Sequence, residues 1–218
     1  SSDLHSDKKI KSNADEIVSL MTPVIKSFFT DIGMEITNDA IQVFGGYGYT
    51  KDQGIEQLFR DNRITPIYEG TNSVQAIDLV YRKILNNKIF EKYISQLNEE
   101  IKDYEKNKNL ELFVQKFQKY LELLNNFTSW ISKKDKISKD DVSAACNDYL
   151  KVFGYISLAH SWLKILKVSY EKFDQNKNFF EDKINTATYY FDKILPRAQS
   201  HYLSAITGSN GLMKTKFN

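Results

Sequence analysis

The chain has 218 residues, of which 41% are hydrophobic and 27% charged, and its formal net charge is +2. This composition excludes a disordered chain, and the interleaving of lysines with acidic residues excludes a nucleic-acid-binding protein. The single cysteine, Cys146, excludes an intramolecular disulfide. No Cys/His cluster has the spacing of a zinc site, so we expect no metal.

The sequence also predicts the class of fold. No stretch approaches the ~20 uninterrupted apolar residues of a bilayer span, and residues 1–5 lack the apolar core of a signal peptide. We therefore expect an intracellular protein without a membrane span. The chain has only three prolines and nine glycines, and polar and apolar residues rarely alternate, which predicts an all-α fold. We expect two helical domains, residues 1–86 and 87–218.

Apolar residues recur at helical spacing over residues 13–43. Thr22 and Pro23 interrupt this pattern, because proline prefers the first turn of a helix and threonine is a fair N-cap. The pattern is compatible with one short helix and one long helix, or with a single kinked helix. Gly45 and Gly46 are expected to end it, since glycine is common just past a helix C-terminus.

A turn-rich connection then leads to a short helical piece over residues 55–60, followed by the loop 61–70. Thr71 is a plausible N-cap for the next helix, which is expected to end at Asn86 and Asn87.

Beyond this point the composition shifts toward Lys, Glu and Asn, and a second helical bundle is predicted. Its four periodic segments begin near Asn87, Asn109, Lys139 and Asn178. Pro196 should bend or restart the fourth. The aromatic stripes on these segments favour core packing, and Cys146 is expected to be a small buried residue. His160 and His201 lie on such faces without a ligand cluster, so we interpret both as structural.

Two motifs in the first domain, taken alone, do not indicate a function. The glycine-rich turn at residues 45–48 lacks the spacing of a phosphate-binding loop, so it favours a glycine-stopped helix. Its glycines would nevertheless let a polyanion approach backbone N–H groups. Arg60, Asp61 and Arg63 are compatible with an ordinary surface ion-pair cluster.

Glu69 alone would be interpreted as a solvated loop glutamate. The preceding apolar side chains, Ile64, Pro66, Ile67 and Tyr68, would give it a partly apolar setting. Such a setting raises the pKa of a carboxyl group toward that of a useful base. The following glycine leaves room for a substrate chain.

Taken together, the run from Gln42 to Gln75, QVFGGYGYTKDQGIEQLFRDNRITPIYEGTNSVQ, resembles the C-terminal signature of acyl-CoA dehydrogenases. It holds their Gly-Gly turn, Arg-Asp pair and Ile-Tyr-Glu-Gly-Thr loop at the same separations. The resemblance implies that Glu69 removes the α-proton of an acyl-CoA thioester while the β-hydrogen leaves as hydride to N5 of FAD. It also implies that the backbone N–H of Glu69 donates to the thioester carbonyl oxygen.

The resemblance implies further contacts. Gln42 and Gly46 would lie against the FAD of a neighbouring subunit, Thr71 near the flavin's own phosphates, and Gly70 along the thioester. Ser73 departs from the acidic or amide residue common in the family. The implied partners are electron-transfer flavoprotein and a second copy in a homodimer, in the bacterial cytoplasm or, second in preference, the mitochondrial matrix.

Residues 74–83 and 187–196 resemble a subgroup of large acyl-CoA dehydrogenases with a helical C-terminal extension, similar to methylthiopropionyl-CoA dehydrogenase. Tyr47 stands where a histidine is frequent in this subgroup. The family builds its FAD site mainly from a middle β-barrel domain and closes its acyl pocket with an N-terminal helical domain. Neither fits ahead of the signature, so we expect a C-terminal part that is inactive alone. The alternative is a non-catalytic helical assembly module that retains the dehydrogenase fold.

Overall fold

The computed structural model describes residues 8–86 and 89–216, and all regular structure in these two ranges is helical. The prediction of an all-α fold is therefore confirmed. The chain forms two compact units, residues 1–86 and residues 87–218. Asn87, at which the sequence predicts a helix boundary, lies outside the described residues. Residues 1–5, which the sequence analysis compared with a signal peptide, also lie outside them.

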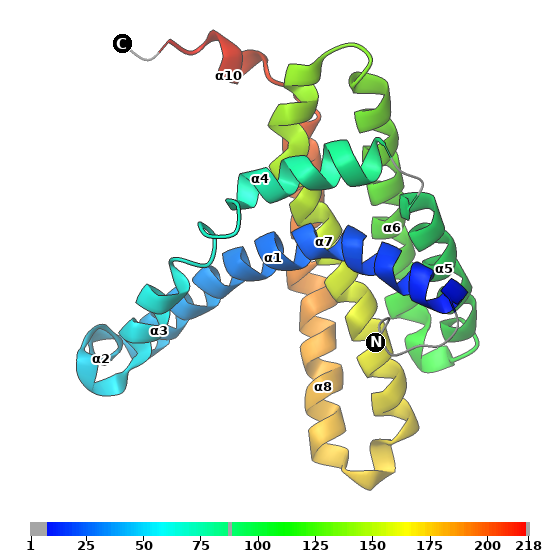
Figure 1. Ribbon diagram of the computed structural model, residues 1–218. Coiled ribbons are helices and arrows are strands. Elements are labelled where there is room, and N and C mark those ends of the chain that lie inside the picture. The colour runs from blue at the N-terminus through cyan, green and yellow to red at the C-terminus, as the bar shows by residue number, and fades with distance from the viewer. Residues whose placement is uncertain (1–7, 87–88, 217–218) are drawn as a thin grey trace. The chain divides into compact units, whose positions relative to one another are not determined.

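The first unit is organised around one long helix (Figure 1). Its elements are α1 (Lys8–Phe44), α2 (Gly46–Tyr49), a 3-10 turn (Lys51–Gln53), α3 (Ile55–Asn62), α4 (Asn72–Ile77) and a π-helical continuation of α4 (Asp78–Ile84). Both α3 and α4 pack against α1. The buried side chains of this unit come mainly from α1 and from α4 with its continuation, and include Leu20, Val24, Phe28, Ala76, Leu79 and Val80. The loop 63–71, which joins α3 to α4, is thereby held beside α1.

Helix α1 runs without a break through Pro23, so the two-helix interpretation is wrong for this segment. Pro23 is buried, and the hydroxyl of Thr22 donates to the carbonyl oxygen of Val18 at 2.7 Å instead of capping a new helix. The helix ends where the glycines predicted, with Gly45 at φ 61°.

Among the described residues, the stretch Ile10–Phe44 of α1 is long and apolar enough to cross a membrane, judged by length and composition only. A core helix of a soluble protein passes the same test, so this property is weak evidence. Polar contacts from the middle of α1, made by Lys26 and Asp31, tie it to the start of α4. The finding does not establish a membrane span.

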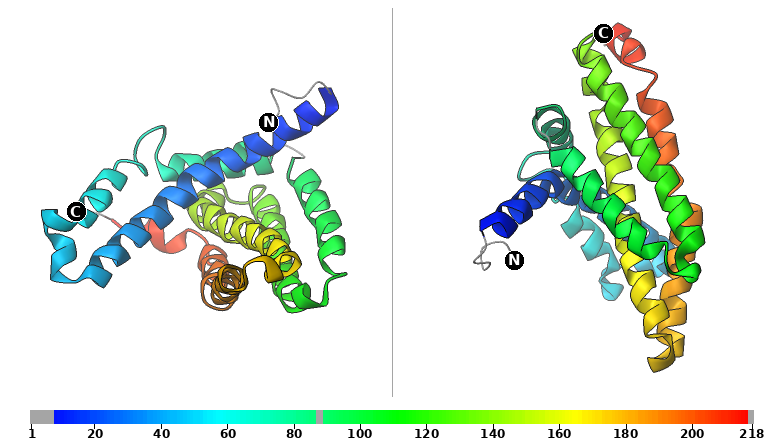
Figure 2. Two further views of the ribbon diagram at one scale, coloured as in Figure 1. Left: turned by 90° about the horizontal axis from the view of Figure 1, so that it is seen from below. Right: turned by 90° about the vertical axis from the view of Figure 1, so that its right-hand side faces the viewer.

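The second unit is a helical bundle (Figure 2). Its main helices are α5 (Ile89–Tyr104), α6 (Glu111–Lys134), α7 (Lys139–Glu171), α8 (Lys177–Tyr189), α9 (Arg197–Ala205) and α10 (Asn210–Lys214), with 3-10 turns at Lys108–Leu110 and Phe173–Gln175 and a π-helical turn at Tyr190–Ile194. Helix α7 packs against α6, α8 and α9, and is the centre of the bundle. Pro196 precedes the first residue of α9, as expected for a residue that restarts a helix.

The aromatic stripes form the core of this bundle, as the sequence predicts. Phe127 is fully buried and meets Trp130, Tyr149 and Tyr202 edge to face, with ring centroids 6.1, 5.1 and 5.2 Å away. Edge-to-face contact is a favoured geometry for aromatic pairs. Cys146 is buried on α7, which agrees with its interpretation as a packing residue.

Candidate functional site

The sequence singled out five residues in the first unit, and the structure places them in two groups. Glu69, Gly70 and Thr71 are consecutive in the loop that enters α4. Gln42 is near the end of α1, and Gly46 begins α2. Residue 26 of α1 contacts the loop, and from there to residue 42 the helix rises about 24 Å at about 1.5 Å per residue. The fold therefore gives two separate exposed regions along α1.

Glu69 has an unusual backbone conformation. Its φ is 54°, and it is the only non-glycine residue with positive φ among the described residues. Gly70 follows at φ 82°. Residues with a Cβ rarely adopt this region, and such strain persists only where the surroundings fix it. The side chain of Thr71 then accepts a hydrogen bond from the backbone N–H of Val74, at 3.4 Å, and so caps α4 as predicted.

Three side chains that the sequence did not single out hold this loop. Lys26 Nζ donates to the carbonyl oxygen of Gly70 at 2.8 Å and to Asn72 Oδ1 at 2.9 Å. Asn72 Nδ2 donates to Asp31 Oδ1 at 2.7 Å, and Gln75 Nε2 donates to the carbonyl oxygen of Glu69 at 2.9 Å. For Lys26 alone the sequence held a signal, because it is the only charged residue between positions 21 and 29.

The apolar enclosure that the sequence predicted around Glu69 is absent from the described residues. Ile64, Ile67 and Tyr68 are 53%, 47% and 49% exposed, and Glu69 is itself exposed. These side chains are adjacent in sequence, but no other element in the described part of the first unit covers the loop. The backbone N–H of Glu69 makes no hydrogen bond to any described residue, so it is available as a donor.

The residues that the resemblance assigned to FAD are open to a ligand. Gln42 and Gly46 are exposed, and a Cβ built on Gly46 would meet nothing within 4 Å, so a ligand can approach the backbone closely there. The hydroxyl of Thr71 is exposed and uses only its acceptor capacity in capping α4. Arg60 forms a surface ion pair, but its partner is Glu56 on the same helix and not the predicted Asp61.

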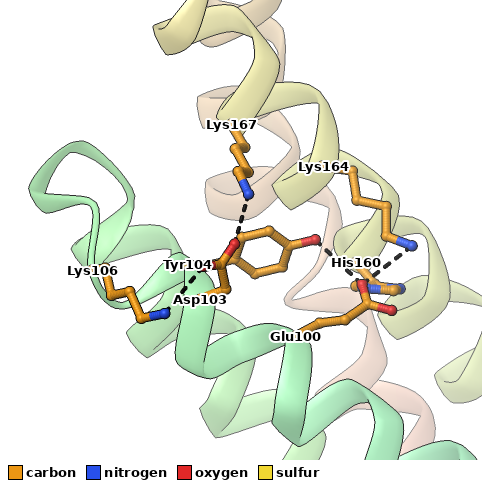
Figure 3. A network of polar contacts seen from close by, with 7 residues as sticks. All are labelled: Glu100, Asp103, Tyr104, Lys106, His160, Lys164 and Lys167. Atoms are coloured by element: carbon orange, nitrogen blue, oxygen red, sulfur yellow. Dashed lines mark hydrogen bonds and ion pairs between the residues drawn. The ribbon is translucent and has the colours of Figure 1, made fainter.

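A second polar cluster lies in the second unit, between α5 and α7 (Figure 3). The buried His160 contacts Glu100 through Nε2 at 2.9 Å, and Lys164 pairs with the same carboxylate at 3.2 Å. Burial lowers the pKa of His160, against the hydrogen bond with Glu100, which raises it. Because its charged groups pair with one another, we interpret this cluster as structural. In residues 8–86 and 89–216, no group of three or more His, Cys, Asp or Glu side chains could hold a metal ion.

The all-α fold matches the C-terminal helical domain of acyl-CoA dehydrogenases. Residues 9–85 match the family described as "Acyl-CoA dehydrogenase, C-terminal domain". Residues 97–216, more than half of the chain, match the family described as "Acetyl-CoA dehydrogenase C-terminal like". The chain therefore belongs to the acyl-CoA dehydrogenase family, and it represents a C-terminal part of such a protein.

Individual relatives match a short part of the chain. A 3-methylmercaptopropionyl-CoA dehydrogenase of Ruegeria pomeroyi is 36% identical over 83 residues, which are 38% of this chain and 14% of the relative. A cyclohexane-1-carbonyl-CoA dehydrogenase of Geobacter metallireducens is 52% identical over 60 residues, or 28% of this chain and 16% of the relative. A probable acyl-CoA dehydrogenase of Mycobacterium leprae is 56% identical over 52 residues, which are 24% of this chain and 13% of the relative. The matched stretches are thus about a seventh of each relative's length.

Proposed function

We propose that this chain supplies the catalytic base and part of the thioester-binding surface of an FAD-dependent acyl-CoA dehydrogenase. The observation that carries the proposal is the loop at the start of α4, where a glutamate is held at φ 54° and its backbone N–H bonds to none of the described residues. The family match and the relatives' names support acyl-CoA as the class of substrate.

In the proposed reaction the carboxylate of Glu69 takes the α-proton of the acyl chain as the bond between Cα and Cβ becomes double. The backbone N–H of Glu69 donates to the thioester carbonyl oxygen, where negative charge develops as the proton leaves. Gly70 adds no side chain beside the substrate, which leaves room for the thioester. Bound FAD supplies the acceptor, at N5, for the hydride that leaves Cβ.

Gln42, Gly46 and Thr71 are the residues that would hold FAD. The separation of about 24 Å along α1 between residues 26 and 42 favours contact with two different flavins, as in a homodimer whose subunits share their sites. We also propose that electron-transfer flavoprotein accepts the electrons from the reduced flavin. The proposed location of the protein is the bacterial cytoplasm. The subgroup with a helical extension is supported by the match over residues 97–216 and by the Ruegeria pomeroyi relative.

The exposure of Glu69 bears on whether this chain forms a complete active site. A base for an α-proton works best in a water-excluded pocket, and Ile64, Ile67 and Tyr68 leave the loop open. We therefore propose that further domains of the dehydrogenase cover this loop, and that the chain is inactive without them.

The test is Glu69→Gln in the dehydrogenase assembled from this chain and its upstream domains. The amide keeps the size of the side chain but cannot accept the α-proton, so we expect turnover to fall by about 10²- to 10⁴-fold. Bound flavin, measured by visible absorption, should be unchanged. Glu122→Gln, which changes an exposed glutamate of α6, is the matched control and should retain full turnover. Equal turnover in the two variants would remove Glu69 as the base.

A further inference from the structure

The backbone of the Glu69 loop needs support from outside the loop. A glutamate at φ 54° followed by a glycine at φ 82° is not a conformation that the local sequence favours. Within the loop, Asn72 N donates to the carbonyl oxygen of Pro66 at 3.2 Å, which closes the turn but does not involve Glu69. The contacts that reach the peptide units of Glu69 and Gly70 come from Gln75 and Lys26.

Lys26 and Asn72 form a clamp between α1 and this loop. Lys26 bonds both Gly70 and Asn72, while the amide of Asn72 reaches Asp31 and also the carbonyl oxygen of Ser27, at 3.2 Å. Lys26 and Asn72 are both partly buried, whereas residues 67–71 are exposed. The clamp therefore fixes the exposed loop to the centre of a long helix.

Helix stability alone does not account for this arrangement. The N-terminus of a helix favours negative charge, yet the ammonium group of Lys26 lies against the first residue of α4. The cap of that helix is already provided by Thr71. The two side chains are better explained by the carbonyl oxygen of Gly70, which Lys26 holds in place while Asn72 holds the ammonium group of Lys26.

We propose that Lys26 and Asn72 are positioning residues that set the place of the Glu69 carboxylate and of its backbone N–H relative to the substrate. This inference rests on the proposed function, because it assigns a purpose to the loop that carries the proposed base. Misplacement of a reacting group by about 1 Å can cost about 100-fold in rate. Loss of the clamp is accordingly expected to lower kcat far more than it changes KM.

The test compares variants of the assembled dehydrogenase. Asn72→Ala removes the amide, and Lys26→Met removes the ammonium group but keeps most of the apolar stem. Asn72→Asp places a carboxylate against Asp31, and adding Asp31→Asn restores a donor and an acceptor between positions 72 and 31 but not the donation to the carbonyl oxygen of Ser27. Ser19→Ala is the control, since it removes a different contact between α1 and the α4 continuation, that of Ser19 with Lys83.

We expect Asn72→Ala and Lys26→Met to lower kcat by about 10- to 100-fold. The isotope effect with α-deuterated substrate should rise, because proton removal becomes slower relative to other steps. The combined Asn72→Asp and Asp31→Asn variant should recover part of the kcat that Asn72→Asp loses, and Ser19→Ala should behave as wild type. Backbone amide hydrogen exchange in residues 64–71 should quicken in Asn72→Ala and not in Ser19→Ala.

A structural role alone would lower the unfolding temperature of Asn72→Ala and leave kcat and the isotope effect at the values of Ser19→Ala, which would overturn the proposal. If Asn72→Ala does not fold, Lys26→Met and the combined variant decide in the same way. If the wild-type dehydrogenase binds flavin without turning over acyl-CoA, the proposed function fails. The hydrogen-exchange comparison then still decides whether the clamp orders the loop, and equal exchange would refute it.

Discussion

The pKa of Asp141 is lowered by hydrogen bonds and an ion pair that form in the fold. Its Oδ1 accepts hydrogen bonds from the backbone N–H and the hydroxyl of Ser209, each at 2.8 Å, and its Oδ2 pairs with Lys134 at 3.1 Å. The bonds from Ser209, followed by that from Lys134, hold the pKa of Asp141 at about 2, against an ordinary 3.8. These contacts tie the segment before α10 to the start of α7.

Because the folded-state pKa lies below the unfolded value, the ionised carboxylate stabilises the fold above about pH 4, and this contribution is lost as the pH falls toward 2. Asp141→Asn should therefore lower the unfolding temperature at pH 6 and flatten its dependence on pH between 4 and 2. Thermal unfolding followed by circular dichroism across this range measures both effects. Asp140→Asn, at an exposed neighbour, should reproduce the wild-type curve, and a wild-type curve for Asp141→Asn would contradict the argument.

The sequence predicted those residues of the candidate site that are adjacent in the chain. Glu69, Gly70 and Thr71 are adjacent in the chain, so one motif contains them all. Lys26 and Asn72 meet only because α4 packs back on α1, and no local pattern encodes that contact. The role of Glu69 in catalysis stays a prediction.

At the scale of elements, periodicity predicted the helices well and left open whether the first helix is interrupted at Pro23. A proline inside a helix loses one backbone hydrogen bond and costs about 3 kcal/mol, which is why a break at Pro23 was a reasonable expectation. In the fold, Pro23 and its neighbour Val24 are buried, and Leu20 is completely so. Burial of apolar side chains across both sides of the proline offsets its cost, and such packing cannot be read from the local sequence.

Gly48 lies where α2 packs on the end of α1, and a substitution there tests this packing. The residue is buried, and a Cβ placed on it would come within 2.6 Å of the carbonyl oxygen of Ile41 and 2.8 Å of the Cβ of Phe44. Because one of these atoms belongs to the backbone, Gly48→Ala must push α2 away from α1. We expect a loss of about 1 to 3 kcal/mol in the free energy of unfolding.

The matched control for this prediction is Gly46→Ala in the same short helix. A Cβ there meets nothing within 4 Å, so the free energy of unfolding should change by no more than about 0.5 kcal/mol. Urea denaturation monitored by circular dichroism compares the two variants. Equal stabilities would mean that α2 does not pack against α1 as described.

At the scale of the whole molecule, the sequence predicted the all-α class because helical periodicity extends through nearly every segment. The assignment of residues 1–86 to a dehydrogenase helical domain and of residues 87–218 to an extension remains a prediction. The surroundings of Glu69 could not be predicted, because adjacent apolar residues enclose a carboxylate only when another element covers them. In the described part of the first unit, no such element covers Ile64 and Ile67.

This exposure predicts how the chain should behave toward flavin. Gln42, Gly46 and Thr71 are all exposed, and small-molecule sites usually bury most of their ligand. The purified chain mixed with FAD should therefore show no flavin absorption band after desalting. When co-expressed with the upstream dehydrogenase domains, it should yield a flavin band that bleaches when acyl-CoA is added.

The same spectra separate the two classes of function that the sequence left open. A band that appears only on complementation and bleaches with acyl-CoA supports a dehydrogenase part. Oxidation of acyl-CoA by the chain alone, with a dye as acceptor, would refute its proposed dependence on further domains. Absence of flavin in both samples would favour the non-catalytic helical module, for which Glu69→Gln should have no consequence.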